Sequence, residues 1–178
     1  DLVGLETVNR NARNGMNLIG AMESTSGEIL RVLNRMRELA TKNATETMTP
    51  TDRSEAQIEF VALQDEIQRL AQTTHMNRVQ GLAVSDTMTF QVGAGGGAAN
   101  QVVLSLRSMT LNALSVGPGN VDISQMSHAQ DALNKIDTAL SRLNTRRSQM
   151  AATFTQLNAA FEVTAGDREA LLNTLNVI

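Results

Sequence analysis

The chain has 178 residues, a length that suits one domain, and 42% of them are hydrophobic whereas only 2% are aromatic. An enzyme of this length normally carries more aromatic side chains in its core and around its pocket. The net charge of −3 argues against a surface for nucleic acid or an anionic membrane. No cysteine is present, which excludes disulfides, cysteine zinc sites and thiol nucleophiles.

The two ends and the apolar runs bear on localisation. No apolar run approaches the roughly 18 residues that a membrane span needs. The sequence begins at Asp1 without a methionine, a basic region or an apolar signal core. Both ends fall inside helical patterns, so we expect a fragment that has been trimmed at both ends.

The first predicted element is a long helix over about residues 2–42. Small and apolar residues recur there in alternating steps of three and four, which places them on one helical stripe typical of coiled-coil packing. Gly15 lies on the stripe, where a small residue favours close approach of a neighbouring element. The stripe consists of Leu5, Val8, Ala12, Gly15, Ile19, Met22, Ser26, Ile29, Leu33, Met36 and Ala40.

A second helix is predicted over about residues 52–72. Thr49 has the character of an N-cap, Pro50 suits the first helical position, and Asp52 lies near the positive end of the helix dipole. The short connection after the first helix predicts that the two helices are antiparallel neighbours.

The middle of the chain favours a β-hairpin over about residues 86–107. Residues 88–92 and 101–106 are short and rich in β-forming residues, and a glycine-rich stretch separates them. Residues 107–121 predict a loop that contains at most one helical turn.

A third helix is predicted over about residues 124–177, capped by Asp122 or Ser124. Its stripe keeps the same spacing to the end of the chain and includes Phe154, and residues 165–167 are a candidate kink. The fold class that follows is mainly α: an elongated antiparallel bundle of three long helices with a small β-hairpin, forming one domain over residues 1–178.

No constellation of residues predicts catalysis, a metal or a cofactor. His75 and His128 are the only histidines, and neither has a carboxylate or second histidine at ligand spacing. Gly93 begins a formal match to the dinucleotide fingerprint, but a strand follows where a helix is needed. Asn43 begins a glycosylation sequon, a three-residue match that is common by chance.

Several segments resemble bacterial flagellins. Residues 10–15 read RNARNG, similar to the flagellin RNAxDG, and residues 35–40 read RMRELA, similar to QRxRELA, with Asn34 where the family has Gln. Residues 73–77 (TTHMN) are similar to the flagellin TTxFNG, with Met76 in place of Phe and Arg78 in place of Gly, and residues 90–94 (FQVGA) are similar to FQVGAN. Residues from 122 onward resemble the opening of the C-terminal helix of that family. The resemblance covers nearly the whole chain up to about residue 157.

This resemblance implies a structural, non-enzymatic subunit of the extracellular flagellar filament that self-assembles for motility. Its partners are other flagellin subunits, with no nucleic acid, membrane or cofactor. The terminal segments that form the innermost filament tube are not in this sequence, so we expect the fragment to be monomeric. Two alternatives remain: a flagellar hook-associated junction protein, and a secreted enzyme built on a helical rod.

The resemblance also implies a contact surface. Arg35 and Glu38 lie off the apolar stripe and point away from the core, and Leu39 flanks it. The family segment recognised by Toll-like receptor 5 falls, by match, on Arg35, Leu39 and Glu59. The alternative is that this charged face, with Arg37 and Glu38, contacts a neighbouring protofilament. Both roles are compatible with one surface.

Overall fold

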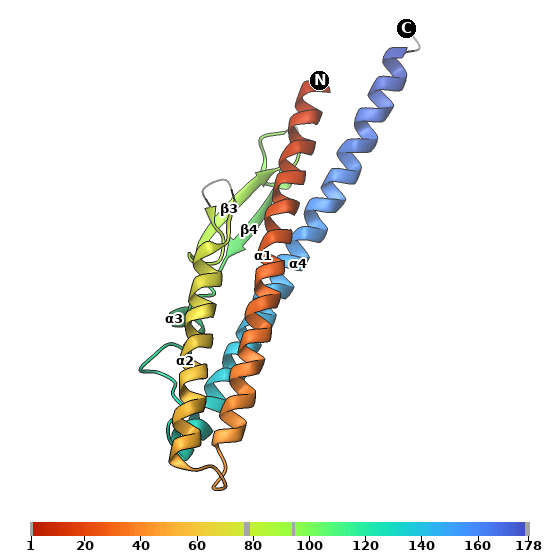
Figure 1. The fold of residues 1–178 in the computed structure, drawn as a ribbon. Coiled ribbons are helices and arrows are strands. Elements are labelled where there is room, and N and C mark those ends of the chain that lie inside the picture. The colour runs from red at the N-terminus through yellow and green to blue at the C-terminus, as the bar shows by residue number, and fades with distance from the viewer. Residues whose placement is uncertain (1, 77–78, 94, 177–178) are drawn as a thin grey trace. The chain divides into compact units, whose positions relative to one another are not determined.

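The structure, a computed structural model, describes residues 2–76, 79–93 and 95–176. The chain forms two compact units. Unit 1 comprises residues 1–21, 86–106 and 148–178, and unit 2 comprises residues 22–85 and 107–147. The first and last helices, the longest elements in Figure 1, contribute residues to both units.

Helix α1 covers Leu2–Asn43, against the predicted range 2–42. The side chains of the predicted stripe lie in the core from Val8 to Ala40, with Met22, Ile29 and Met36 at most 1% exposed. The stripe also buries Ser26, whose Oγ donates to the carbonyl of Met22 at 2.6 Å. This internal bond satisfies the hydroxyl, so a polar residue is tolerated on an otherwise apolar face.

Helix α2 covers Pro50–Thr73, against the predicted range of about 52–72, and begins at the proline that the sequence analysis assigned to the first helical position. A capping box fixes this start: Thr49 Oγ1 accepts from the backbone N–H of Asp52, and Asp52 Oδ2 accepts from the N–H of Thr49. Proline is well suited to the first helical position because its missing N–H has no partner there. Phe60, Ile67 and Leu70 bury the inner face of α2.

The predicted hairpin is formed by β3 (Asp86–Gln91) and β4 (Gln101–Leu106), paired antiparallel with Phe90 opposite Val102. Alternate residues of β4 are buried, so one face of the hairpin packs on the core of unit 1. The sequence analysis missed a second, minimal ladder in unit 2, where β1 (His75–Met76) pairs with β2 (Val79–Gln80). Two-residue strands are too short to leave a period-2 signal in the sequence.

Residues 107–125 connect β4 to the last helix, with one short helix, α3 (Leu111–Leu114), as predicted. Glutamines of α2 hold this segment by its backbone. Gln64 Nε2 donates to the carbonyls of Val116 (2.8 Å) and Val121 (3.2 Å), and Gln57 Oε1 accepts from the N–H of Ile123 at 2.7 Å. The irregular backbone is thereby satisfied although much of it is buried.

Helix α4 covers Met126–Asn176, two residues short of the predicted start at 124. Asp122 Oδ1 accepts from both the backbone N–H and the hydroxyl of Ser124, which keeps these residues in a turn. The helix continues without a break through Gly166, the position at which the sequence analysis placed a candidate kink. Phe154 is 40% exposed, so the predicted stripe does not stay buried along the whole helix.

Helices α1 and α4 run antiparallel within each unit. In unit 2, Arg37 of α1 pairs with Asp137 of α4, and Glu23 of α1 pairs with Arg147 of α4. In unit 1, Asn9 of α1 bonds to Thr164 of α4, and Glu6 of α1 pairs with Arg168 of α4. The beginning of α1 and the end of α4 accordingly lie at the same end of unit 1 (Figure 1). These elements confirm the predicted mainly helical class with a small hairpin. No helix in the described part of the chain is long and apolar enough to cross a membrane.

Candidate interaction surface

The predicted contact residues Arg35 and Glu59 meet on the surface of unit 2. Arg35 lies on α1 and Glu59 on α2, and the guanidinium forms a two-point ion pair with the carboxylate: Nε to Oε1 is 2.7 Å and Nη2 to Oε2 is 3.2 Å. Nη1 also donates to Glu38 Oε2 at 3.0 Å. The hydrogen bonds with Glu59 and then Glu38 raise the pKa of Arg35. The two carboxylates fix the direction of an exposed cation.

Leu39 lies differently from its charged neighbours. Its side chain is only 5% exposed, because α2 covers the flank of the α1 stripe. It forms part of the floor of a groove of about 380 Å³ between α1 and α2, which we call the acidic groove. The groove is lined by Arg35, Glu38, Leu39, Lys42, Asp52, Glu55, Ala56 and Glu59. Four carboxylates against two basic groups make this lining net negative.

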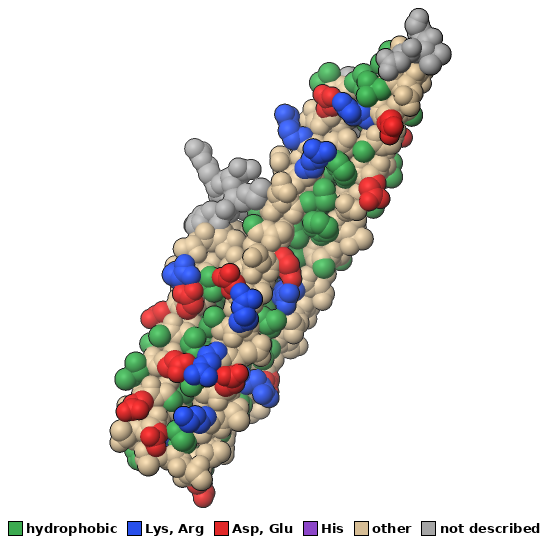
Figure 2. All heavy atoms as spheres, turned by 45° about the vertical axis from the view of Figure 1, so that its right-hand side comes forward, with side chains coloured by type: hydrophobic (Ala, Val, Ile, Leu, Met, Phe, Trp, Pro, Cys, Tyr) green, Lys and Arg blue, Asp and Glu red, His purple; other side chains and the backbone are tan. Residues whose placement is uncertain are grey.

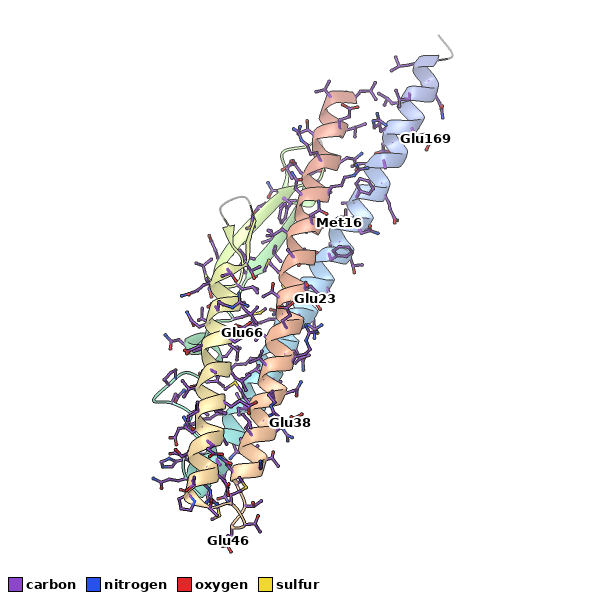
Figure 3. The ribbon with its side chains drawn as sticks, in the orientation of Figure 1. Met16, Glu23, Glu38, Glu46, Glu66 and Glu169 are labelled. Atoms are coloured by element: carbon purple, nitrogen blue, oxygen red, sulfur yellow. The ribbon has the colours of Figure 1, made fainter. Side chains whose placement is uncertain are left out.

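The sequence analysis did not place Lys42, Asp52 and Glu55 at this surface. They join it because the turn after α1 brings the start of α2 beside the end of α1; Glu46 lies in that turn, away from the helix pair (Figure 3). The short connection between the two helices predicted that they are antiparallel neighbours. Which residues face each other depends on the register of the two helices, and the sequence pattern does not reveal that register.

Arg37 belongs to a different face of α1. Its Nε donates to Asp137 Oδ1 on α4 at 2.6 Å, and this hydrogen bond raises the pKa of Arg37. Glu38 lies between the two faces, because it contacts Arg35 and also borders a second hollow with Arg37. The structure therefore brings Arg35, Glu38, Leu39 and Glu59 together, and it places Arg37 beside them but engaged with α4.

The remaining motifs have structural explanations. Asn43 is fully buried and its Nδ2 donates to the carbonyl of Ile123 at 3.0 Å, so the sequon amide is not accessible in the folded chain. After Gly93 come a single 3-10 turn (Ala98–Asn100) and then β4, so the helix needed for a dinucleotide site is replaced by a strand. A Cβ at position 93 would overlap the side chain of Asn100, which explains the glycine.

The structure describes the surroundings of His128 but not those of His75. The side chain of His75 lies outside the described residues. His128 does have a carboxylate neighbour, contrary to the sequence analysis: its Nδ1 is 2.9 Å from Oδ1 of Asp122, the residue that caps the turn before α4. Burial raises the pKa of Asp122, but hydrogen bonds from Ser124 and His128 outweigh it and the pKa lies below its ordinary value. Among the described residues, no three such side chains are grouped to hold a metal ion.

Comparisons with known proteins agree on one family. Residues 1–87 match the family described as the bacterial flagellin N-terminal helical region. A flagellin of Halalkalibacterium halodurans is 34% identical over 150 residues, which are 84% of this chain and 54% of that protein. A flagellin of Salmonella typhimurium is 30% identical over 131 residues, 74% of this chain and 26% of that protein.

Solved structures show the same fold. The crystal structure of Bacillus cereus flagellin is similar with a TM-score of 0.76 and 25% identity, covering 86% of this chain and 88% of that one. A flagellar hook-associated protein from Vibrio parahaemolyticus has a TM-score of 0.80 over 99% of this chain and 92% of that one, at 13% identity, which is a likeness of fold alone.

Long helices that run antiparallel within each unit, together with a small hairpin, define a mainly helical protein. The chain belongs to the bacterial flagellin family. It spans about half the length of the first of these relatives (54%) and about a quarter of the second (26%).

Proposed function

We propose that this protein is a structural subunit of the bacterial flagellar filament, located outside the cell and assembled with other copies of itself for motility. The observation that carries the proposal is the match to flagellins over residues 1–87, with the fold of a flagellin over 86% of the chain. Flagellins are structural proteins and not enzymes, so membership of this family argues against the alternative of a secreted enzyme.

Assembly, and not catalysis, is the mechanism. Each copy presents different charged surfaces, and contacts between unlike surfaces of identical subunits repeat without closing, which produces a helical filament. The long buried stripes of α1 and α4 keep each subunit ordered, while exposed ion pairs such as Arg35–Glu59 leave charged groups at the surface for neighbours.

Immunoelectron microscopy tests this proposal. Antibodies against the protein should label the filament along its whole length, and loss of the gene should abolish the filament and swimming. The alternative, a hook-associated junction protein, predicts label only at the boundary between hook and filament. Label confined to that boundary would overturn the filament proposal.

We also propose that the 178-residue chain is a single rod domain of the flagellin and is monomeric in solution. Contacts between exposed charged side chains contribute little individually and are screened by salt, so they hold no stable oligomer on their own. Sedimentation velocity should give one species whose mass does not change with concentration. Concentration-dependent growth of a heavier species would contradict the monomer.

A second role concerns recognition by Toll-like receptor 5. The resemblance assigned it to Arg35, Leu39 and Glu59, and the two charged members form an ion pair on the surface beside the buried leucine. This proximity supports one receptor-binding surface on α1 and α2. The same surface, with Arg37 and Glu38, is also suited to contact a neighbouring subunit in the filament. Binding of the receptor ectodomain to variants separates the two roles.

A further inference from the structure

Unit 1 carries a groove in which every basic residue of that unit is found. The lysine and arginine residues of unit 1 are Arg10, Arg13 and Arg168, and all three line one groove of about 430 Å³ between α1 and α4. The remaining lining residues are Glu6, Asn9, Phe161 and Ala165. Basic side chains gather on this part of the molecule beside apolar ones (Figure 2). Three arginines against one glutamate make this basic groove net positive.

The arginines of the basic groove are held in different ways. Arg168 Nη2 bonds to Glu6 Oε1 at 3.1 Å, which uses the only carboxylate of the groove. The guanidinium of Arg13 lies 4.9 Å from the centre of the Phe161 ring, and Arg13 forms no ion pair in the part of the chain that the structure describes. Arg10 is exposed and forms no ion pair within the described residues. Two cations are thus available to an acidic partner.

Unit 2 carries the complement of this groove. The acidic groove has a similar size, about 380 Å³, and opposite net charge, with four carboxylates against two basic groups. Arg35 binds Glu38 and Glu59, and Asp52 is engaged by Thr49. Glu55 is exposed and forms no ion pair within the described part of the chain. Each groove therefore has an exposed charge that its own unit leaves uncompensated.

We propose that the basic groove of one copy binds the acidic side chains around Glu55 of the next copy in the filament. The inference rests on the proposed self-assembly and names the surfaces that meet. Opposite net charges favour this pairing, whereas basic against basic and acidic against acidic repel each other. Because the two surfaces are different, the contact is head-to-tail, and such a contact extends into a filament when the rotation between neighbouring copies does not close a ring.

Charge reversal with complementation tests this pairing. Arg10→Glu and Glu55→Arg each reverse one exposed charge that takes part in no ion pair of the described chain. Either variant alone places like charges opposite each other. When both variants are mixed and alternate along the filament, every contact again joins opposite charges. The reversed groove of the Arg10→Glu variant meets the reversed surface of the Glu55→Arg variant. At the next contact, the native groove of the Glu55→Arg variant meets the native surface of the Arg10→Glu variant. Arg31→Glu is the control, since Arg31 is exposed, lies outside both grooves and has one ion-pair contact, at 3.9 Å, with Glu28 of its own helix.

The experiment measures seeded filament growth by electron microscopy, using the protein as the cell exports it. Each single variant should grow at least tenfold more slowly than the parent, the equimolar mixture should recover to within about twofold, and Arg31→Glu should grow like the parent. Normal growth of the single variants, or no recovery on mixing, overturns the pairing. Inorganic phosphate is a second test: if it binds the basic groove without slowing growth, the groove is an anion site unrelated to assembly, and the pairing is overturned.

If the proposed function itself is wrong, the experiment gives a different result from failure of the pairing: the parent protein does not extend a filament seed. Recovery on mixing also excludes misfolding, since an unfolded subunit cannot be rescued by a second variant. If Arg10→Glu fails to fold, Arg13→Glu from the same groove replaces it with the same expected result.

Discussion

Gly15 and Leu157 are in such close contact that a Cβ atom on the glycine would lie 2.8 Å from Cδ1 of the leucine. The same Cβ would lie 3.1 Å from the ring of Phe90 on β3, so α1, α4 and the hairpin meet at this position of unit 1. We predict that Gly15→Ala destabilises the protein by about 1–3 kcal/mol, because a packed core must shift to admit the methyl group. Urea unfolding measures the change.

Gly20 provides the matched control within the same helix. A Cβ at Gly20 would meet nothing within 4 Å, and its backbone is helical. Gly20→Ala should therefore stabilise the protein by up to about 1 kcal/mol through helix propensity alone. If both substitutions change the free energy of unfolding in the same direction, the close approach at Gly15 does not constrain the fold.

The sequence predicted what depends on periodicity and local chemistry. The alternating steps of three and four located the buried face of α1, including Gly15, and the Thr49–Asp52 pattern located the start of α2. It did not predict contacts set by tertiary register. Arg37 and Asp137 are 100 residues apart, and no local pattern pairs them. Likewise, Phe154 keeps its stripe spacing but is exposed, because Thr153 takes the inward position between the buried Met150 and Leu157.

Gln64 is a second contact that local patterns do not reveal, and it gives the second prediction. Its amide is buried and donates to two carbonyls of the irregular segment before α4. Gln64→Ala should cost about 1–3 kcal/mol, since it leaves buried carbonyls without a donor. The exposed Gln72 on the same helix is the control, and Gln72→Ala should change stability by less than about 0.5 kcal/mol. Equal effects in chemical denaturation would contradict the assigned role of Gln64.

The capping box of α2 makes stability depend on acid pH. The side-chain hydrogen bond from Thr49, and then its backbone N–H, lower the pKa of Asp52 below its ordinary 3.8. A lowered pKa in the folded state means that the ionised carboxylate stabilises the fold above pH 3.8, and that this contribution is lost as pH falls through the folded pKa. Asp52→Asn should reduce the loss of melting temperature between about pH 5 and pH 2. Superimposable pH profiles for parent and variant would exclude this role.

The ion pair of Arg35 and Glu59 gives the last prediction, which separates recognition from stability. Both side chains are about half exposed, so Arg35→Ala and Glu59→Ala should each shift the melting temperature by no more than about 2 °C, as expected for surface substitutions. If Toll-like receptor 5 binds this surface, each change should weaken binding at least tenfold, because arginine is a typical interface anchor and Glu59 fixes the direction of its guanidinium. Arg31→Ala, on the same helix and more exposed, should bind like the parent. Leu39 cannot separate the two effects because its truncation also disturbs the core. Surface plasmon resonance with the receptor ectodomain measures the affinity, and normal binding by both variants with unchanged melting would exclude this surface as the receptor site.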